Sequence, residues 1–129
     1  MDILRGLSSV PDSFAEAGTV VTIGVFDGVH RGHQLLISKA VSTARELGVP
    51  CVVMTFDPHP VTIFAPERAP RALMSLDERA RHIAELGVDA LLVIDFRDEL
   101  AGLTPAEYMD DVLVSTLGAK HVLLSLIHI

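Results

Sequence analysis

Residues 49–56, with the sequence V-P-C-V-V-M-T-F, are apolar at nearly every position. A strand exposed on one face alternates apolar and polar residues, so this run predicts a strand covered on both faces, as in a parallel sheet. Three further apolar runs predict strands at residues 19–24, 88–96 and 120–129. Helix signals separate these strands, at residues 32–47, 75–87 and 104–117. Strands joined by helical crossovers predict an α/β fold built on a three-layer, Rossmann-like parallel sheet.

The predicted helices have recognisable ends and faces. Thr104 is followed by Pro105, and Ser75 is followed three residues later by Glu78, which is the chemistry of helix N-caps. The helix over residues 32–47 is expected to bury one apolar face, formed by Leu35, Leu36, Ile37, Ala40, Val41 and Ala44. Residues 57–74 contain four prolines, which excludes a long regular element there.

The composition excludes several classes of protein. The chain has 129 residues and a formal net charge of −7, without a cluster of Lys or Arg, so we expect no nucleic-acid partner. No apolar run approaches the ~20 residues of a membrane span, and the N-terminus has no signal-peptide pattern, so we expect no membrane association. The single cysteine, Cys51, is expected to pack as a small hydrophobic residue, which fits a cytoplasmic protein.

The segment G-V-F-D-G-V-H-R-G-H, residues 24–33, joins the first predicted strand to a helix. Gly24 and Gly28 permit turns or a close backbone approach that other residues do not allow. Gly32 leaves room for a flat ligand or a phosphate, and His30 and His33 share a face if the turn is already helical. The free N–H groups of a helix N-terminus favour an anion, so the segment predicts a phosphate clamp. The alternative is two surface histidines in a glycine-rich turn.

Other phosphate and metal motifs do not fit this segment. No G-K-[ST] follows the glycines, and the dinucleotide fingerprint G-x-G-x-x-G is absent. Two histidines three residues apart can share a zinc ion, but no third ligand is near them in the sequence. We therefore assign no metal-ligating residue.

The G-x-F-D-G-x-H-x-G-H segment resembles the signature of the H-x-G-H nucleotidyltransferase superfamily. Three further segments strengthen the resemblance: T-F-D-P-H-P at 55–60, L-G-V-D-A-L-L-V-I-D-F at 86–96, and residues 103–122. With them, the chain resembles the adenylyltransferase module of bacterial FAD synthetases, which are bifunctional riboflavin kinase/FMN adenylyltransferases. The resemblance covers nearly all of residues 19–122 and implies a sheet of the nucleotidyltransferase type.

The resemblance implies transfer of AMP from ATP to FMN, with release of pyrophosphate and with Mg²⁺ as the cofactor. His30 and His33 match the phosphate-contacting pair of the family and are the expected catalytic residues. Gly32 matches the position where adenine stacks close to the backbone. The implied ATP-binding residues are Gly24, Phe26, Asp27, Gly28, His30, Gly32 and His33. Asp27 either orients a backbone turn or approaches the metal.

The proline-rich segment that begins at residue 57 has two interpretations. It is either a proline-stiffened surface loop or a wall of the FMN site. In the second case Pro58, Pro60 and Phe64 offer flat apolar contacts to the isoalloxazine ring, and His59 offers a polar tip. The resemblance favours the FMN-binding interpretation.

The resemblance ends after G-A-K-H-V, where the family continues with a G-[ED]-[DN]-F-x-F-G segment, an I-S-S-T-x-x-R motif and a β-barrel riboflavin kinase domain. This chain reads L-L-S-L-I-H-I instead. We expect residues 1–123 to be the N-terminal part of the adenylyltransferase module, with a sheet incomplete at its C-terminus. Residues 124–129 resemble one translated frame of a transposase adapter used in sequencing libraries, and we expect them to be a non-native tail.

Two consequences follow from these expectations. The riboflavin kinase domain is expected in a full-length parent and absent here, and the fragment is expected to be weakly active or inactive. The alternative functions are another H-x-G-H adenylyl- or cytidylyltransferase with a different acceptor, and a non-catalytic nucleotide-binding module.

Overall fold

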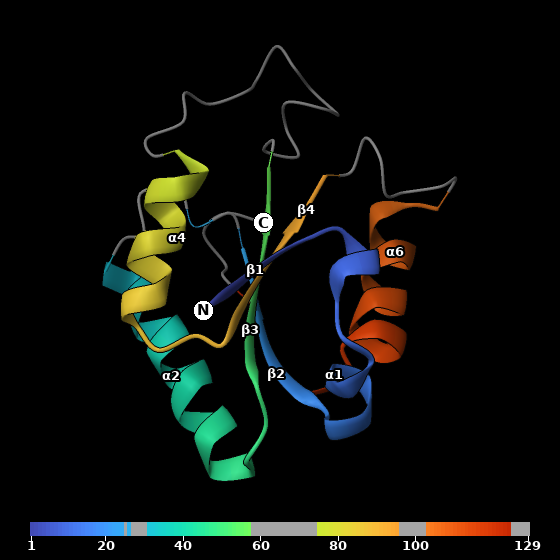
Figure 1. Ribbon diagram of the computed structural model, residues 1–129, viewed down its shortest axis with the longest axis horizontal. Helices are drawn as coiled ribbons and strands as arrows, with labels where there is room; N and C mark the ends of the chain where they lie inside the picture. Colours follow the sequence, from blue (N-terminus) through green and yellow to red (C-terminus); the bar gives the residue numbers. More distant parts are fainter. Residues whose placement is uncertain (25, 27–30, 58–74, 96–102, 125–129) are drawn as a thin grey trace.

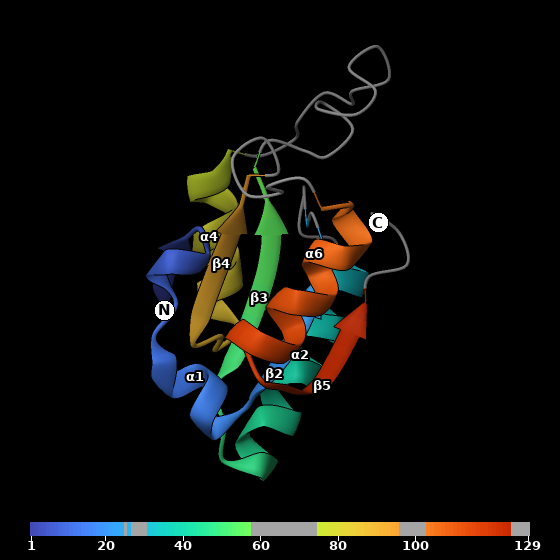
Figure 2. The same cartoon turned by 90° about the vertical axis from the view of Figure 1, so that its right-hand side faces the viewer.

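The computed structural model describes residues 1–24, 26, 31–57, 75–95 and 103–124. Its centre is a sheet of five strands, and every strand pair in it is parallel. The strand order is β1-β4-β3-β2-β5. The strands are β1 (Asp2–Arg5), β2 (Thr19–Ile23), β3 (Cys51–Phe56), β4 (Ala90–Ile94) and β5 (Ala119–Leu124). Because all strands run the same way, their carboxyl ends meet at one edge of the sheet (Figures 1 and 2).

Helices cover both faces of the sheet, which confirms the predicted three-layer α/β fold (Figure 1). On one face lie α2 (Arg31–Leu47) and α4 (Leu76–Glu85). On the other lie α1 (Asp12–Ala17) and α6 (Pro105–Asp111), with a 3₁₀ turn at Leu7–Ser9 and a π-helical turn at Val112–Thr116. Among the described residues, no helix is long and apolar enough to cross a membrane.

Each face of the sheet has its own hydrophobic core. All six residues of β3 are buried, as the continuous apolar run predicted, and alternate residues point to opposite faces. Cys51 and Val53 pack with Ile37 of α2 and Ile83 of α4. On the opposite face, Val52, Met54 and Phe56 pack with residues of α6 and the π turn, including Tyr108, Val112 and Leu117.

The order of the strands reverses beside β2. From β2 the chain passes through α2 to its neighbour β3, and then through α4 to β4. From β4 it returns through α6 to the other side of β2, where β5 pairs with β2. In open α/β sheets, ligands bind at the carboxyl ends of the strands at such a switch point. The switch point places the carboxyl end of β2, and the segment that follows it, at the expected ligand edge.

The predicted helix ends are confirmed at both caps. The Ser75 hydroxyl accepts a hydrogen bond from the backbone N–H of Glu78 at 3.2 Å. At α6, Thr104 and Glu107 form a complete capping box, with distances of 3.2 and 3.0 Å. The helical segment ends at Gly118, whose φ is 53°. A Cβ there would lie 2.7 Å from the carbonyl oxygen of Ala15, so both the backbone conformation and the packing favour glycine.

Three expectations differ from the structure. The prediction gave four strands, but residues 2–5 form a fifth, β1, at the sheet edge, and α1 follows it. Leu35 does not belong to the buried face of α2, because its side chain is 69% exposed. The last helical segment extends to Thr116, as predicted, but only Pro105–Asp111 is α-helical: its final turn is a π turn, closed by the bond from Leu117 N–H to the Val112 carbonyl at 2.9 Å.

Candidate functional site

The segment after β2 leaves the sheet without an unusual conformation at Gly24. The Gly24 N–H donates to the Met54 carbonyl at 3.1 Å, so the residue continues the ladder between β2 and β3. Among the described non-glycine residues, the positive backbone φ belongs instead to Phe26, at 58°. A bulky residue rarely adopts this conformation, and such strained positions cluster at functional sites. Phe26 is therefore the described non-glycine residue of this segment with a left-handed backbone conformation.

Phe26 is fully buried and packs against the first turn of α2. Its ring meets the imidazole of His33 edge-on, with centroids 5.2 Å apart and an interplanar angle of 86°. His33 is 1% exposed and begins the buried stripe of α2, which continues through Ile37 and Ala40. His33 is therefore not a surface histidine, because packing against an aromatic ring fixes its imidazole beneath the N-terminus of the helix.

Gly32 lies in the first turn of α2 and is exposed. No atom of the described residues beyond its neighbours and its own helix lies within 4 Å of the position that a Cβ would take. Its φ is not in the left-handed region, so neither packing nor backbone geometry within the described part of the chain demands a glycine here. The open space fits the expectation that a flat ligand approaches the backbone at this residue.

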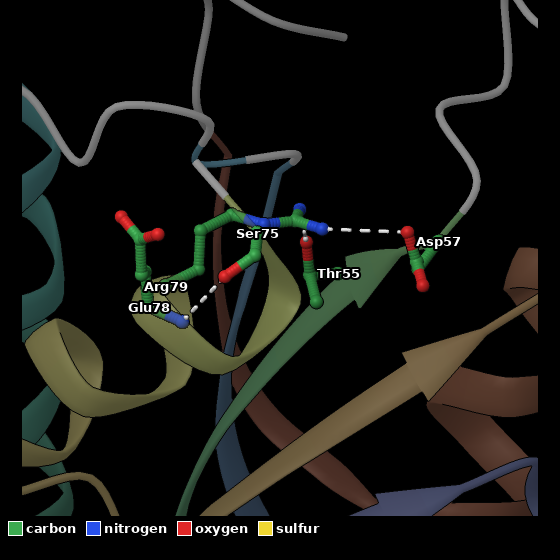
Figure 3. A network of polar contacts seen from close by, with 5 residues as sticks. All are labelled: Thr55, Asp57, Ser75, Glu78 and Arg79. Atoms are coloured by element: carbon green, nitrogen blue, oxygen red, sulfur yellow. Dashed lines mark hydrogen bonds and ion pairs between the residues drawn. The ribbon is translucent and has the colours of Figure 1, made fainter. Parts of the chain in front are cut away.

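A second polar group lies at the carboxyl end of β3 (Figure 3). Arg79 of α4 is 5% exposed, and its Nη1 donates to the Thr55 hydroxyl at 3.4 Å. Its Nη2 lies 3.6 Å from the Asp57 carboxylate, whose side chain is 45% exposed. Thr55 and Asp57 are two residues apart, so both face the helix layer formed by α2 and α4.

The two groups are neighbours in the fold. Strands β2 and β3 pair with Ile23 opposite Met54, so the carboxyl ends of these strands lie side by side. Phe26 belongs to the core on the α2 and α4 face, where Arg79 also lies. The carboxyl ends of β2 and β3, on the face covered by α2 and α4, therefore carry two polar groups. One is the His33 imidazole packed against Phe26, and the other is the Asp57 carboxylate paired with Arg79.

The structure describes only part of the predicted site. It brings together Phe26 and His33, and it places Gly24 and Gly32 at the two ends of the same segment. The other predicted site residues lie outside the described residues; they are Asp27, Gly28, His30, Pro58, His59, Pro60 and Phe64.

Sequence reasoning gave no role to Arg79 or Asp57. The alternation of side chains along β3 could have indicated Asp57. If the strand continues, one face carries Cys51, Val53, Thr55 and Asp57. Arg79 also precedes Ala80 and Ile83 on the buried side of its helix, which is unusual for a cation.

A family model described as FAD synthetase matches residues 13–125, which is most of the chain. The chain belongs to the FAD synthetase family. The match includes the segment around Phe26 and His33, the end of β3 and all of α4.

Curated relatives of this family member are named bifunctional riboflavin kinase/FMN adenylyltransferase. The protein of Escherichia coli K12 is 40% identical over 120 residues, which are 93% of this chain and 38% of the relative. The protein of Pseudomonas fluorescens is 42% identical over 122 residues, 95% of this chain and 38% of the relative. The chain thus spans about 38% of the length of these relatives.

The fold is also similar to a solved structure. A crystal structure described as a macrolide-efflux protein from Streptococcus pneumoniae superposes with a TM-score of 0.74 and 27% sequence identity. The match covers 96% of this chain and 41% of that one. The similarity supports the nucleotidyltransferase-like, Rossmann-type arrangement of the sheet.

The single cysteine of this FAD synthetase family member, Cys51, lies in the core. Cys51 is buried in β3, and burial, followed by the nearby Asp89 carboxylate, raises the pKa of its thiol from 9.0 to about 12. A thiol with such a pKa is neutral at physiological pH and is therefore a poor nucleophile. Cys51 has the packing role that the sequence predicted.

Proposed function

We propose that this chain carries the FMN adenylyltransferase activity of its family, the transfer of AMP from ATP to FMN. The observation that carries the proposal is the match to the FAD synthetase family across residues 13–125, which include His33 of α2 packed against Phe26. FAD formation in this way is the step that such a module would contribute to a flavin pathway. The relatives' names add riboflavin kinase activity, which belongs to those longer proteins.

The reaction requires no nucleophilic side chain from the protein. A phosphate oxygen of FMN attacks the α-phosphorus of ATP, the bond from that phosphorus to the β-phosphate oxygen breaks, and pyrophosphate leaves. A phosphate monoester has a second pKa near 6, so FMN is mostly dianionic at neutral pH and needs no base. The protein's task is to align two polyanions and to stabilise the charge on the α-phosphate and the leaving group.

His33 and His30 are proposed to perform that stabilisation. An imidazole at a helix N-terminus can donate a hydrogen bond to a phosphate and can take a proton as negative charge accumulates. The contact with Phe26 supports the role of His33, because it restricts the orientation of the imidazole before the reaction begins. Gly32 is proposed to admit the adenine ring, and Gly24, Asp27 and Gly28 complete the proposed ATP segment.

The acceptor side is proposed to follow β3. Pro58, His59, Pro60 and Phe64 come directly after the described end of that strand and are the proposed contacts to FMN. The carboxyl ends of β2 and β3 lie side by side, which is the arrangement needed to bring the two substrates together.

Magnesium is proposed to accompany ATP rather than to occupy a protein cage. Among the described residues, no group of three or more His, Cys, Asp or Glu side chains gathers as a metal site. Mg²⁺ commonly binds through substrate phosphates, waters and one or two carboxylates, so it does not require a larger group of protein ligands. When bound, the ion would supply charge neutralisation of the triphosphate. We also propose the cytoplasm as the compartment, where ATP and FMN are available.

The proposal is tested with ATP labelled at the α-phosphate. The purified chain is titrated with ATP and with FMN by calorimetry. In parallel, residues 13–122 replace the matched segment of the Escherichia coli relative, and the chimera is assayed for acceptor use. We expect labelled FAD from FMN and no transfer to pantetheine phosphate. Transfer to pantetheine phosphate, or use of CTP with glycerol phosphate, would assign the chain to another H-x-G-H transferase. Nucleotide binding without any transfer by the chimera would identify a non-catalytic module.

A further inference from the structure

Arg79 is a buried cation to which the proposed function assigns no role. Its side chain is 6% exposed and contacts two residues at the end of β3, the Thr55 hydroxyl at 3.4 Å and the Asp57 carboxylate at 3.6 Å (Figure 3). Burying a guanidinium is costly unless polar partners compensate for the lost water. The cost indicates that these contacts do more than fill space in the core.

Asp57 is the partner that faces outward. Its side chain is 45% exposed, and its backbone N–H donates to the Ile94 carbonyl at 3.1 Å. The backbone is thus held as an extension of β3 beside β4, while Arg79 restrains the carboxylate. An ionised carboxylate only accepts hydrogen bonds, so Asp57 offers acceptor atoms at a fixed place on the ligand edge.

The ligand edge therefore differs in polarity between its two ends, at the N-terminus of α2 and at Asp57. The chain after β2 leads to the N-terminus of α2, where the helix dipole and His33 favour an anion. The neighbouring strand β3 is followed by Asp57, whose exposed carboxylate is paired with Arg79 and accepts hydrogen bonds from a ligand's donors. A ligand with one anionic end and one donor-bearing end can bind across this edge in only one favourable direction.

FMN is such a ligand. Its phosphate is anionic, and the rest of the molecule carries donors, namely the ribityl hydroxyls and one ring N–H. We infer that Asp57, held by Arg79, sets the direction of the flavin acceptor by accepting a hydrogen bond from a ribityl hydroxyl or the ring N–H. The phosphate then points toward α2 and the α-phosphorus of ATP. The inference rests on the proposed function. Arg79 acts through Asp57 and is a positioning residue.

Riboflavin separates the two ends of the ligand, because it has the donors of FMN without the phosphate. We would measure binding of both flavins to the 129-residue chain by quenching of flavin fluorescence. Asp57→Asn is expected to weaken FMN and riboflavin equally, by about tenfold, because the lost charge-assisted hydrogen bond lies at their shared end. Arg79→Met should cause a similar loss, and the double variant should lose little more than either single variant.

Conservative and matched variants distinguish positioning from folding. Arg79→Lys keeps the charge and is expected to recover most of the affinity that Arg79→Met loses. Glu78→Gln removes an exposed carboxylate that points away from Arg79 in Figure 3, and Arg81→Met removes an exposed cation of α4. Neither control should change flavin binding. The urea midpoint of each variant gives its stability under the same conditions.

Several results would overturn the inference. Tighter FMN binding by Asp57→Asn with unchanged riboflavin binding would place the phosphate beside Asp57. Unchanged affinities in all variants, or losses that follow the urea midpoints and are not rescued by lysine, would leave Arg79 a structural residue. A wild-type chain that binds neither flavin also overturns it. FAD formation by the chimera decides the proposed function separately, so either idea can fail alone.

Discussion

The imidazole of His33 lies edge-on to the ring of Phe26, with the two centroids 5.2 Å apart, and both side chains are buried. Phe26 reaches this position through a left-handed backbone conformation. The residue with the left-handed backbone conformation is thus also the residue that packs against the histidine. Backbone strain and side-chain orientation are coupled at one point of the proposed ATP segment.

Replacing His33 should reduce turnover more than acceptor binding. His33→Asn keeps a polar side chain and is expected to lower the rate of AMP transfer by the chimera about 100-fold, because the imidazole acts where charge develops. Binding of FMN should change little. The measurement is kcat with saturating ATP and FMN, together with the FMN dissociation constant. His82→Asn is the matched control, because His82 is an exposed histidine of α4. Equal turnover of the two variants would remove His33 from its proposed role.

Gly32→Ala should separate folding from ligand binding. Alanine is the better helix former by roughly 0.5–1 kcal/mol, and a Cβ at this position meets none of the described residues beyond its neighbours and its own helix. The free energy of unfolding in urea is therefore expected to rise slightly, while ATP affinity falls because the methyl group occupies the ligand's space. Gly48→Ala is the control: its φ of 69° makes alanine strained, so it should lower stability without a selective effect on ATP. A Gly32→Ala chain with unchanged ATP affinity contradicts the proposed adenine contact.

Removal of the Thr104 hydroxyl at the α6 cap should destabilise the chain and slightly reduce the loss of stability in acid. Thr104→Ala is expected to cost about 1 kcal/mol of unfolding free energy, because it breaks the capping box. The backbone N–H of Thr104, followed by its hydroxyl, holds the pKa of Glu107 below its ordinary value of 4.5, and alanine removes only the contribution of the hydroxyl. The lowered pKa gives stability that is present above pH 4.5 and is lost as the pH falls through the folded-state pKa. Urea midpoints at pH 7 and under acid conditions test this, with Ser115→Ala as an exposed hydroxyl control.

The Cys51 thiol should resist modification in the folded chain. Because burial raises its pKa to about 12, little thiolate exists at pH 8, and a disulfide reagent should react only when the sheet opens. In the unfolded chain the thiol ionises near 9, so its contribution to stability is complete below that pH and is lost as the pH rises toward 12. Reaction in dilute reagent, compared with reaction in 6 M urea, measures the difference. Rapid labelling of the folded chain would show that β3 is not a protected central strand.

The regular parts of the fold were predictable because their signals are local and repeated. A few neighbouring residues are enough to predict each of three features: the buried strand β3, the cap at Thr104 and the helix stop at Gly118. By contrast, β1 has only four residues and acquires its strand conformation by pairing with β4, about ninety positions later. Such a pairing leaves no periodic signal in so short a segment.

The site was predictable in its position and less so in its internal contacts. The strand-to-helix junction indicated the ligand edge, and the topological switch beside β2 agrees with it. The contact between Phe26 and His33 depends on a positive φ at a phenylalanine, which residue propensities argue against. The link from Arg79 to Asp57 joins residues 22 positions apart, and only the packing of α4 on β3 reveals it.

The strand order also implies a sequence of events during folding. The three inner strands β2, β3 and β4 come from residues 19–94, whereas the two edge strands come from residues 2–5 and 119–124. Residues 2–5 are synthesised well before their partners at 90–93. Loop-closure entropy favours the nearer contacts, so the βαβαβ centre should form before either edge attaches. Phe26 and His33 pack within this early unit, and hydrogen exchange during refolding should show protection of β2 and β3 before that of β1.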